Sequence, residues 1–148
     1  MKATVIEDAE VASYVVVCEV GDEAVGALFD FARAERLAAA QVTAIGAFER
    51  AVVGWFDRKA KEYRRIPIAE QCEVLSLVGD IAAGEDGPVL HAHVVLGMAD
   101  GTTGGGHLLE GHVWPTLEVV IREGPAQLRR VHRPELGLAL IDVNASRT

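Results

Sequence analysis

The sequence predicts an α+β fold in which one principal α-helix covers a mainly antiparallel β-sheet. About nine or ten short runs of β-branched and apolar residues recur along the chain, separated by turns containing Gly, Asp or Pro. Only residues 23–39 have apolar side chains at helical spacing. No internal repeat or Pro/Ser-rich linker interrupts the 148 residues, so we expect a single domain spanning 1–148.

The first third of the chain supplies two predicted strands and the helix. Residues 4–6 and 14–20 are rich in β-branched side chains, which favour strands. Asp22 is the expected N-cap of a helix from residue 23 to residue 39, because its carboxylate can accept the first free backbone N–H groups. The apolar stripe of this helix consists of Val25, Leu28, Phe29, Ala32 and Leu37.

Short strands account for most of the remaining sequence. Residues 73–81 form a largely apolar run, which is typical of a strand covered on both faces. Cys18 and Cys72 lie inside strand-like segments without C-x-x-C spacing, so we expect two buried thiols. The predicted strands are 41–50, 51–56, 63–68, 73–81, 91–96, 116–121, 128–131 and 138–143, followed by a frayed tail at 144–148.

A predicted β-hairpin between His91 and His107 gathers three imidazoles. Strand alternation places His91 and His93 on one face. Ala99-Asp100-Gly101 has glycine where a three-residue loop needs a left-handed residue, and this fixes the register of the two strands. Counting back from the loop sets His93 opposite His107, with His91 diagonal to it. The alternative is a bulge at Gly104-Gly105-Gly106, which would turn His107 to the other face.

Three imidazoles on one face form the donor set of a divalent metal site. Neutral imidazole is a common zinc ligand, and three protein ligands leave a fourth position open to water or a small molecule. We therefore expect His91, His93 and His107 to bind Zn²⁺ or a similar ion; the alternative is a neutral cluster hydrogen-bonded to the backbone. His112 falls on the opposite face of an unbroken strand and is a less favoured ligand, and His132 is expected to face solvent.

Glu118 is the candidate for a catalytic or supporting carboxylate. It interrupts an apolar strand, where an unpaired carboxylate would be costly to bury, so it should have a partner or be exposed. It could orient a ligating imidazole or act as a general base beside the metal. Glu73, at the start of another strand, is the alternative. The run Gly104-Gly105-Gly106 lacks the lysine and helix of a phosphate-binding loop and predicts a bulge or a close backbone approach.

Charge and hydropathy restrict the function classes. With 22 acidic and 14 basic residues the net charge is −8, whereas nucleic-acid binders ordinarily carry a basic surface. We expect the basic stretch at 129–133 to be solvated charge. No apolar run approaches the roughly 20 residues of a membrane span and the N-terminus lacks a secretory signal, so we expect a cytoplasmic protein. The densest basic stretch, which supplies the candidate DNA contacts, comprises Arg58, Lys59, Lys61, Arg64 and Arg65.

Several ordered blocks resemble the plants-and-prokaryotes-conserved domain, also called the PPC, PD1-like or DUF296 domain. The most specific are the H-x-H at 91–93, the G-G-H-L at 105–108 and the E-V-V-I at 118–121. The resemblance covers nearly the whole chain. It also includes residues 21–23, 31–32, 44–47, 54–57 and 73–81.

The resemblance implies an α+β fold assembled as a homotrimer. Stand-alone bacterial and archaeal members resemble metal-binding proteins, which implies a ligand role for His91, His93 and His107. Plant members carry an AT-hook, an Arg-Gly-Arg-Pro element that this sequence lacks, so a DNA-associated regulatory role without enzymatic activity is the alternative. A third possible function is that of a purely structural trimerisation module. Many relatives have arginine at the position of Cys18, and an anionic ligand held by that arginine would have no such partner here.

Overall fold

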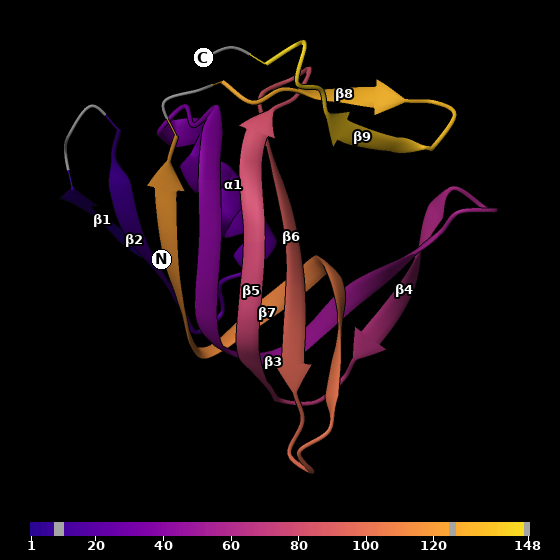
Figure 1. Cartoon of the computed structure of the whole chain (residues 1–148). Coiled ribbons are helices and arrows are strands. Elements are labelled where there is room, and N and C mark those ends of the chain that lie inside the picture. Colours follow the sequence, from indigo (N-terminus) through magenta and orange to yellow (C-terminus); the bar gives the residue numbers. More distant parts are fainter. Residues whose placement is uncertain (8–10, 125–126, 147–148) are drawn as a thin grey trace.

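The computed structural model describes residues 1–7, 11–124 and 127–146, and it confirms the α+β class (Figure 1). Among these residues there are nine strands and one helix. Their bounds are β1 Lys2–Glu7, β2 Ser13–Glu19, α1 Ala24–Ala34, β3 Ala39–Asp57, β4 Glu62–Ile68, β5 Cys72–Ala83, β6 Pro88–Gly97, β7 Thr103–Glu123, β8 Arg130–Arg133 and β9 Leu138–Ile141.

The long strands β3 and β7 make the main sheet curl. This antiparallel sheet has the order β1-β2-β7-β6-β5-β3-β4, and β3 also pairs with β7. The first half of β3 pairs with β5 and the second half of β7, whereas its second half pairs with β4 and the first half of β7. The two strands predicted at 41–50 and 51–56 are therefore one strand, and 116–121 is the last part of a strand of 21 residues.

The helix is shorter than the sequence predicted. It ends at Ala34 rather than at residue 39. Arg36 has a positive φ of 57°, and the backbone N–H of Leu37 donates to the carbonyl of Ala32 at 2.9 Å, which closes the end of the helix. Ala39 already pairs with β5. The small apolar residues at 38–40 suit a helix as well as a strand. Ala40 pairs with β5 on one side and with β7 on the other, and this pairing selects the strand.

The N-cap of α1 is Glu23 and not Asp22. The Glu23 carboxylate accepts hydrogen bonds from the backbone N–H groups of Val25 and Gly26, and a third from Gly111 of β7. Asp22 instead accepts from the backbone N–H of Glu19 at 2.9 Å. The longer Glu side chain satisfies the helix end and a neighbouring strand at once, which Asp22 could not reach from its turn.

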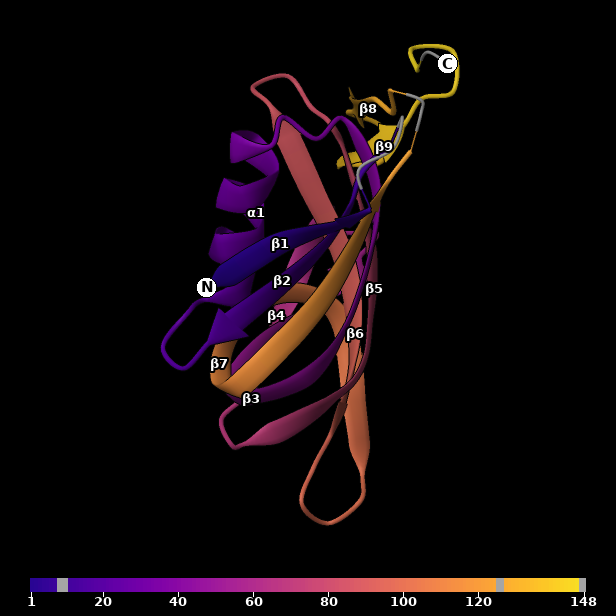
Figure 2. The same cartoon turned by 90° about the vertical axis from the view of Figure 1, so that its left-hand side faces the viewer.

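The core lies between α1 and one face of the sheet (Figure 2). Leu28 and Ala32 are buried as predicted, but Phe29 is 36% exposed and Phe31 is buried in its place. The ring of Phe31 packs edge-on against Tyr14 of β2, with centroids 5.3 Å apart. The buried side of the helix consists of Ala24, Leu28, Phe31 and Ala32, so it is turned about the helix axis from the predicted stripe.

The sheet face that points away from α1, here called the outer face, is bare. Alternation turns Val74, Leu77 and Ile81 of β5 inward, where they are buried, and leaves Leu75 and Val78 each 52% exposed. The expectation that this strand is covered on both faces is therefore wrong for the single chain. Exposed apolar side chains on the outer face are Ile45, Leu75, Val78, Val95 and Val120.

The β8–β9 hairpin forms a separate two-stranded sheet beside one end of the main sheet (Figure 1). Ser146 holds the chain after this hairpin, because its Oγ accepts from the backbone N–H of Arg129 at 3.0 Å. The predicted tail is thus attached up to residue 146, and residues 147–148 lie outside the described part. Cys18 and Cys72 are buried free thiols, as predicted. Across the described residues, no helix has the length and hydropathy needed to cross a membrane.

Candidate metal centre

The hairpin between β6 and β7 has the predicted register. The backbone N–H of Met98 donates to the carbonyl of Thr102 at 2.9 Å, and Gly101 takes the left-handed conformation with φ 83°. His93 pairs directly with His107 across the two strands. The prediction from the three-residue loop is confirmed.

The glycine run approaches neighbouring backbones closely and does not bulge between β6 and β7. Pairing continues without a shift from Gly97–Thr103 to His93–His107. A Cβ on Gly105 would lie 2.3 Å from the carbonyl oxygen of Val94, a distance that real Cβ atoms do not reach. Only glycine lets β7 pass here, and this continuity keeps His107 on the same face as His93.

The three imidazoles meet on the outer face. The Nε2 atoms of His91 and His93 are 3.2 Å apart. Zn–N bonds of about 2.0–2.1 Å in a tetrahedron separate two ligand nitrogens by about 3.3 Å, so this pair is already spaced to hold one ion. One ring nitrogen from each of His91, His93 and His107 lies within 4.8 Å of the others. The residues present therefore fit a metal ion, with His107 needing to approach the other two.

Burial favours the neutral, metal-ligating form of His93 and His107. Burial is the largest cause that lowers the pKa of His107 to about 4, followed by the proximity of His91, His93 and Arg130. The pKa of His93 is lowered by burial and then by His91. Ligation needs an imidazole lone pair, which protonation would remove. At neutral pH, the side chains of His93 and His107 therefore carry this lone pair.

One ring nitrogen of His107, Nδ1, is buried. Its Nδ1 atom has no hydrogen-bond partner among the described residues. The ring lies between Tyr63 of β4 and His91, with centroid distances of 4.6 and 5.1 Å and nearly parallel planes. A buried polar atom without a partner is uncommon in a native fold, and it marks this cluster as a place where a missing group would bind.

Asp80 and Arg130 adjoin the histidines, and no sequence pattern indicated either residue. Asp80 of β5 pairs with His91 in the sheet register, and its carboxylate accepts two hydrogen bonds from Nη2 of Arg130, each 2.9 Å long. The same Nη2 lies 3.0 Å from Nδ1 of His91. Burial would raise the pKa of Asp80, but its interactions with His91 and Arg130 outweigh burial and hold it below the ordinary value.

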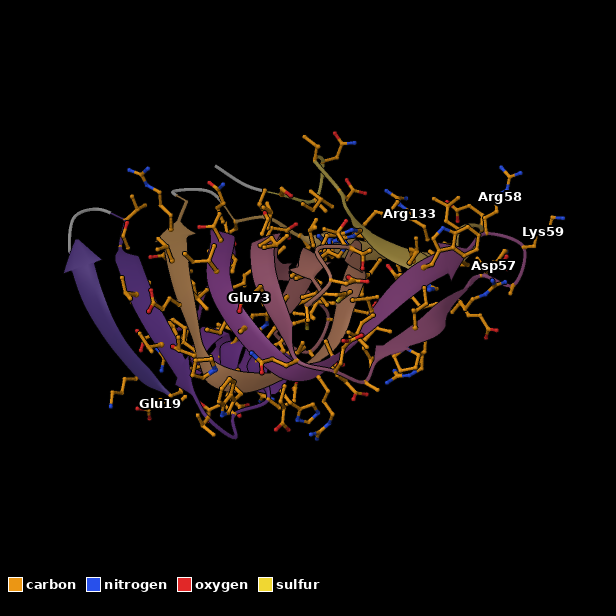
Figure 3. All side chains as sticks on the ribbon, turned by 90° about the horizontal axis from the view of Figure 1, so that it is seen from below. Glu19, Asp57, Arg58, Lys59, Glu73 and Arg133 are labelled. Atoms are coloured by element: carbon orange, nitrogen blue, oxygen red, sulfur yellow. The ribbon has the colours of Figure 1, made fainter. Side chains whose placement is uncertain are left out.

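The other candidates from the sequence lie away from this cluster. Glu118 is exposed in the second half of β7. In the sheet, β3 and β5 lie between this half of β7 and the histidine strand β6. Three strand spacings therefore separate Glu118 from β6, which is about 14 Å. The carboxylate that supports the histidines is therefore Asp80. Glu73 is exposed near the other end of β5 (Figure 3). His112 pairs with Arg50 and is not in the cluster, and His132 is exposed as predicted.

The five basic candidates all lie on the β3–β4 hairpin. Arg58 and Lys59 project from its tip (Figure 3). Lys61 donates to the carbonyl of Pro134 at 3.3 Å, and Arg65 pairs with Glu110. The Arg64 guanidinium lies 5.6 Å from the ring centre of exposed Trp55 and 3.9 Å from Asp57. The basic charge of this arm is thus partly neutralised by its own neighbours.

A groove of about 500 Å³ opens beside the cluster on the outer face. His93 belongs to both, so a molecule in the groove would contact one imidazole of the cluster. Its floor has no side chains because it is formed by the glycine run, and no Asp, Glu, Lys or Arg lines it. The groove is lined by Ser76, Val78, His93, Val94, Val95, Thr103 and Gly104–Gly106.

Comparison with known proteins identifies the family. The model of the Plants and Prokaryotes Conserved (PCC) domain matches residues 6–125. The chain belongs to this family. No protein of curated function matches the sequence.

Solved structures share the PCC fold over almost the whole chain. A plant- and prokaryote-conserved protein of Pyrococcus horikoshii is 29% identical, with 95% of this chain and 94% of that chain covered and a TM-score of 0.83. A metal-containing protein of Archaeoglobus fulgidus is 32% identical over 87% and 91% of the two chains, with a TM-score of 0.80. A Bacteroides thetaiotaomicron protein, provisionally described as DNA-binding, is 26% identical over 96% and 98%, with a TM-score of 0.88.

Proposed function

We propose that this PCC protein binds one divalent ion, Zn²⁺ in the first instance, through His91, His93 and His107, and acts as a single domain of residues 1–148. The observation that carries the proposal is the pair of Nε2 atoms 3.2 Å apart with a third imidazole beside them. The similarity to a metal-containing archaeal protein supports it. Three neutral ligands leave the charge of the ion uncompensated and a coordination position open.

The open position would take a small molecule from the adjoining groove. An ion held by three imidazoles supplies Lewis acidity, which polarises a carbonyl or activates water. The groove supplies apolar walls at Val78 and Val95 and hydroxyl groups at Ser76 and Thr103. This lining favours an uncharged or anionic molecule with a short apolar part. Neither Glu118 nor Glu73, the carboxylates predicted from the sequence, lines the groove.

Metal content tests the proposal directly. Protein purified without chelator, or reconstituted with zinc and desalted, should contain about one ion per chain by elemental analysis. His93→Ala should lose the ion because one of three protein ligands is gone. His132→Ala removes an exposed imidazole outside the cluster and should retain it. Native protein that contains no metal after exposure to zinc would refute the metal function.

We propose that the chain assembles as a homotrimer through the outer face, in the cytoplasm. The support is the row of exposed apolar side chains on that face, together with the resemblance to a trimeric family. An isolated sheet face of this kind is costly to leave in water, and a second copy would cover it. The histidine cluster lies on the same face, so an assembled neighbour would also limit access to the groove.

A DNA-associated regulatory role is the second candidate. Its support is the similarity to the Bacteroides protein provisionally described as DNA-binding, and the exposed Trp55–Arg64 pair on the basic arm. Aromatic and basic side chains together form platforms for nucleic acids. A net charge of −8 and the pairing of Arg65 with Glu110 weigh against it. We therefore place the metal site first.

A further inference from the structure

The basic arm, which is the end of the β3–β4 hairpin from residue 55 to residue 66, projects beyond the rest of the main sheet (Figure 1). Strand β3 pairs with β7 as far as Gly54, and from Trp55 onward it pairs with β4 alone. The arm contains five basic and two acidic residues, a formal charge of +3 in a chain whose net charge is −8. The rest of the chain is therefore strongly acidic and would attract the arm of another copy.

The basic arm exposes both apolar surface and free cations. Trp55 is 56% exposed and Ile66 is 39% exposed. Trp55 pairs with Arg64 across the two strands, and strand alternation places Ile66 on the same face. At the tip, the exposed side chains of Arg58 and Lys59 have no partner among the described residues. Exposed Trp and Arg side chains are the ones that most often supply binding energy at protein interfaces.

A pocket of about 400 Å³ on the outer face, here called the outer-face pocket, has complementary chemistry. Its walls include Ile45, Glu73, Leu75, Thr116 and Glu118. Ile45 is 61% exposed and lies opposite Glu118 in the sheet register. The side chains of Glu73 and Glu118 are exposed and have no ion-pair or hydrogen-bond partner among the described residues. Free carboxylates beside exposed apolar side chains match the free cations and exposed Trp of the arm.

An arm that meets this pocket has to come from a second copy. Arg58 and Lys59 lie at the tip of the arm, whereas Glu73 lies over the body of the main sheet, well apart from them (Figure 3). The contact would therefore join two different surfaces of neighbouring copies. Contacts of this kind generate closed rings such as trimers, whereas a face that pairs with itself generates a two-fold dimer.

We propose that the basic arm of one copy docks in the outer-face pocket of the next copy. Trp55 packs on Ile45 and Leu75, and the cations at the tip face Glu73 and Glu118. This inference rests on the proposed homotrimer, and it is independent of the proposed metal function. It supplies the second surface that a ring needs, and it gives Glu118, which lies away from the histidines, a role at the interface.

Charge reversal tests the contact from both sides. The arm variant is Arg58→Glu with Lys59→Glu, and the pocket variant is Glu73→Lys with Glu118→Lys. In each variant like charges face one another, so we expect the concentration for half-dissociation, measured by light scattering, to rise roughly 100-fold. The quadruple variant faces opposite charges again and should recover the wild-type mass.

The control variant is Arg33→Glu with Arg36→Glu, at exposed arginines near the end of α1, which covers the other face of the sheet. It carries the same change of charge as the arm variant and should keep the wild-type mass. Circular dichroism verifies that each variant is folded.

The outcomes separate the docking contact from the homotrimer itself. A trimeric arm variant beside a dissociated Val120→Glu variant would overturn the docking contact and leave assembly through the outer face standing. The arm would then be free for another partner, such as a nucleic acid. Dissociation that the quadruple variant does not reverse would also overturn the contact. A monomeric wild type would overturn both proposals.

Cross-linking of the wild-type protein gives a test that needs no variant. A carbodiimide joins a lysine to a carboxylate only when the two side chains touch. In an equal mixture of unlabelled and nitrogen-15-labelled chains, allowed to exchange subunits, we expect Lys59 to be joined to Glu73 or Glu118, with mixed-isotope pairs showing that the link runs between copies. Links from Lys59 that lead only to other carboxylates would overturn the docking contact.

Discussion

Burial distinguishes Arg130 from the other basic residues of the chain. The stretch at 129–133 was predicted to be solvated, and this is wrong at Arg130, whose side chain is 6% exposed. Its partner Asp80 is fifty residues away in sequence, and neither residue forms a motif with the histidines. A local charge pattern cannot show which of several arginines finds a carboxylate across the fold. The three histidines could be predicted because they share one hairpin.

Protonation of His107 should destabilise the metal-free protein in acid. Its pKa is about 4 in the folded chain against an ordinary 6.5, so between these pH values the unfolded chain binds a proton that the folded chain does not. The contribution of neutral His107 to the free energy of unfolding is fully present above pH 6.5. It is lost as the pH falls toward 4, at up to about 1.4 kcal/mol per pH unit. His93, whose pKa is also lowered, acts in the same direction.

Urea unfolding at several pH values between 7 and 4.5, with chelator present, measures this effect. His107→Gln should show a shallower loss of the free energy of unfolding than wild type, and His132→Gln should follow wild type. Carboxylates contribute equally to all three proteins, so the difference between variants isolates the histidine. Parallel curves for wild type and His107→Gln would contradict the prediction.

At the scale of elements, the register of the β6–β7 hairpin could be predicted from the sequence, whereas the end of α1 could not. The hairpin register depends on a three-residue loop whose glycine conformation and hydrogen bonds are local. The end of α1 depends on pairing of Ala39 with β5, which lies far along the chain. Residues 35–39 carry no proline or glycine that would end a helix, so the competition between helix and sheet is decided by tertiary contacts.

Gly105→Ala should break the site by displacing a strand. The new Cβ would meet the carbonyl oxygen of Val94 at 2.3 Å, and backbone atoms on both strands would have to move. We expect a loss of stability of about 1–3 kcal/mol and weaker zinc binding, because His93 and His107 face each other across this pairing.

Gly124→Ala is the matched control for that substitution. Its Cβ would lie 3.8 Å from the nearest atom, the carbonyl oxygen of Ala39, which is an ordinary contact. Chemical denaturation and zinc titration of both variants should show a near-neutral effect at Gly124, within about 0.5 kcal/mol. If Gly105→Ala behaves in the same way, the glycine run does not determine the register.

At the scale of the whole molecule, the bare outer face explains why the sequence of β5 looked like that of a strand buried on both sides. Its inward residues are covered by the core and α1, and its outward residues Leu75 and Val78 are not covered by this chain. Hydropathy along a strand depends on whether each face is covered by other protein groups. It does not record whether the cover comes from the same chain or from another copy.

Charging the outer face should therefore dissociate the homotrimer that we propose. Light scattering at micromolar concentration should give a trimer for wild type. Val120→Glu places a carboxylate on the face and should shift the protein toward monomer, since burial of an unpaired charge is unfavourable. Val20→Glu, at a valine that is 63% exposed in the turn after β2, should remain trimeric. A monomeric wild type, or two variants with equal mass, would contradict assembly through this face.

The charge distribution also predicts weak association with DNA. Acidic residues exceed basic residues by eight, and on the basic arm Arg64 and Arg65 already face Asp57 and Glu110. A titration with A·T-rich duplex should give non-specific affinity of roughly 10⁻⁴ to 10⁻⁶ M at physiological salt, falling steeply as salt rises. Removal of Arg58 and Lys59 at the tip should have little effect. The opposite result would be sub-micromolar, sequence-selective binding that survives roughly 200 mM salt and is lost in an Arg58→Ala, Lys59→Ala double variant. That result would assign the function to this arm and leave the histidine cluster a structural role.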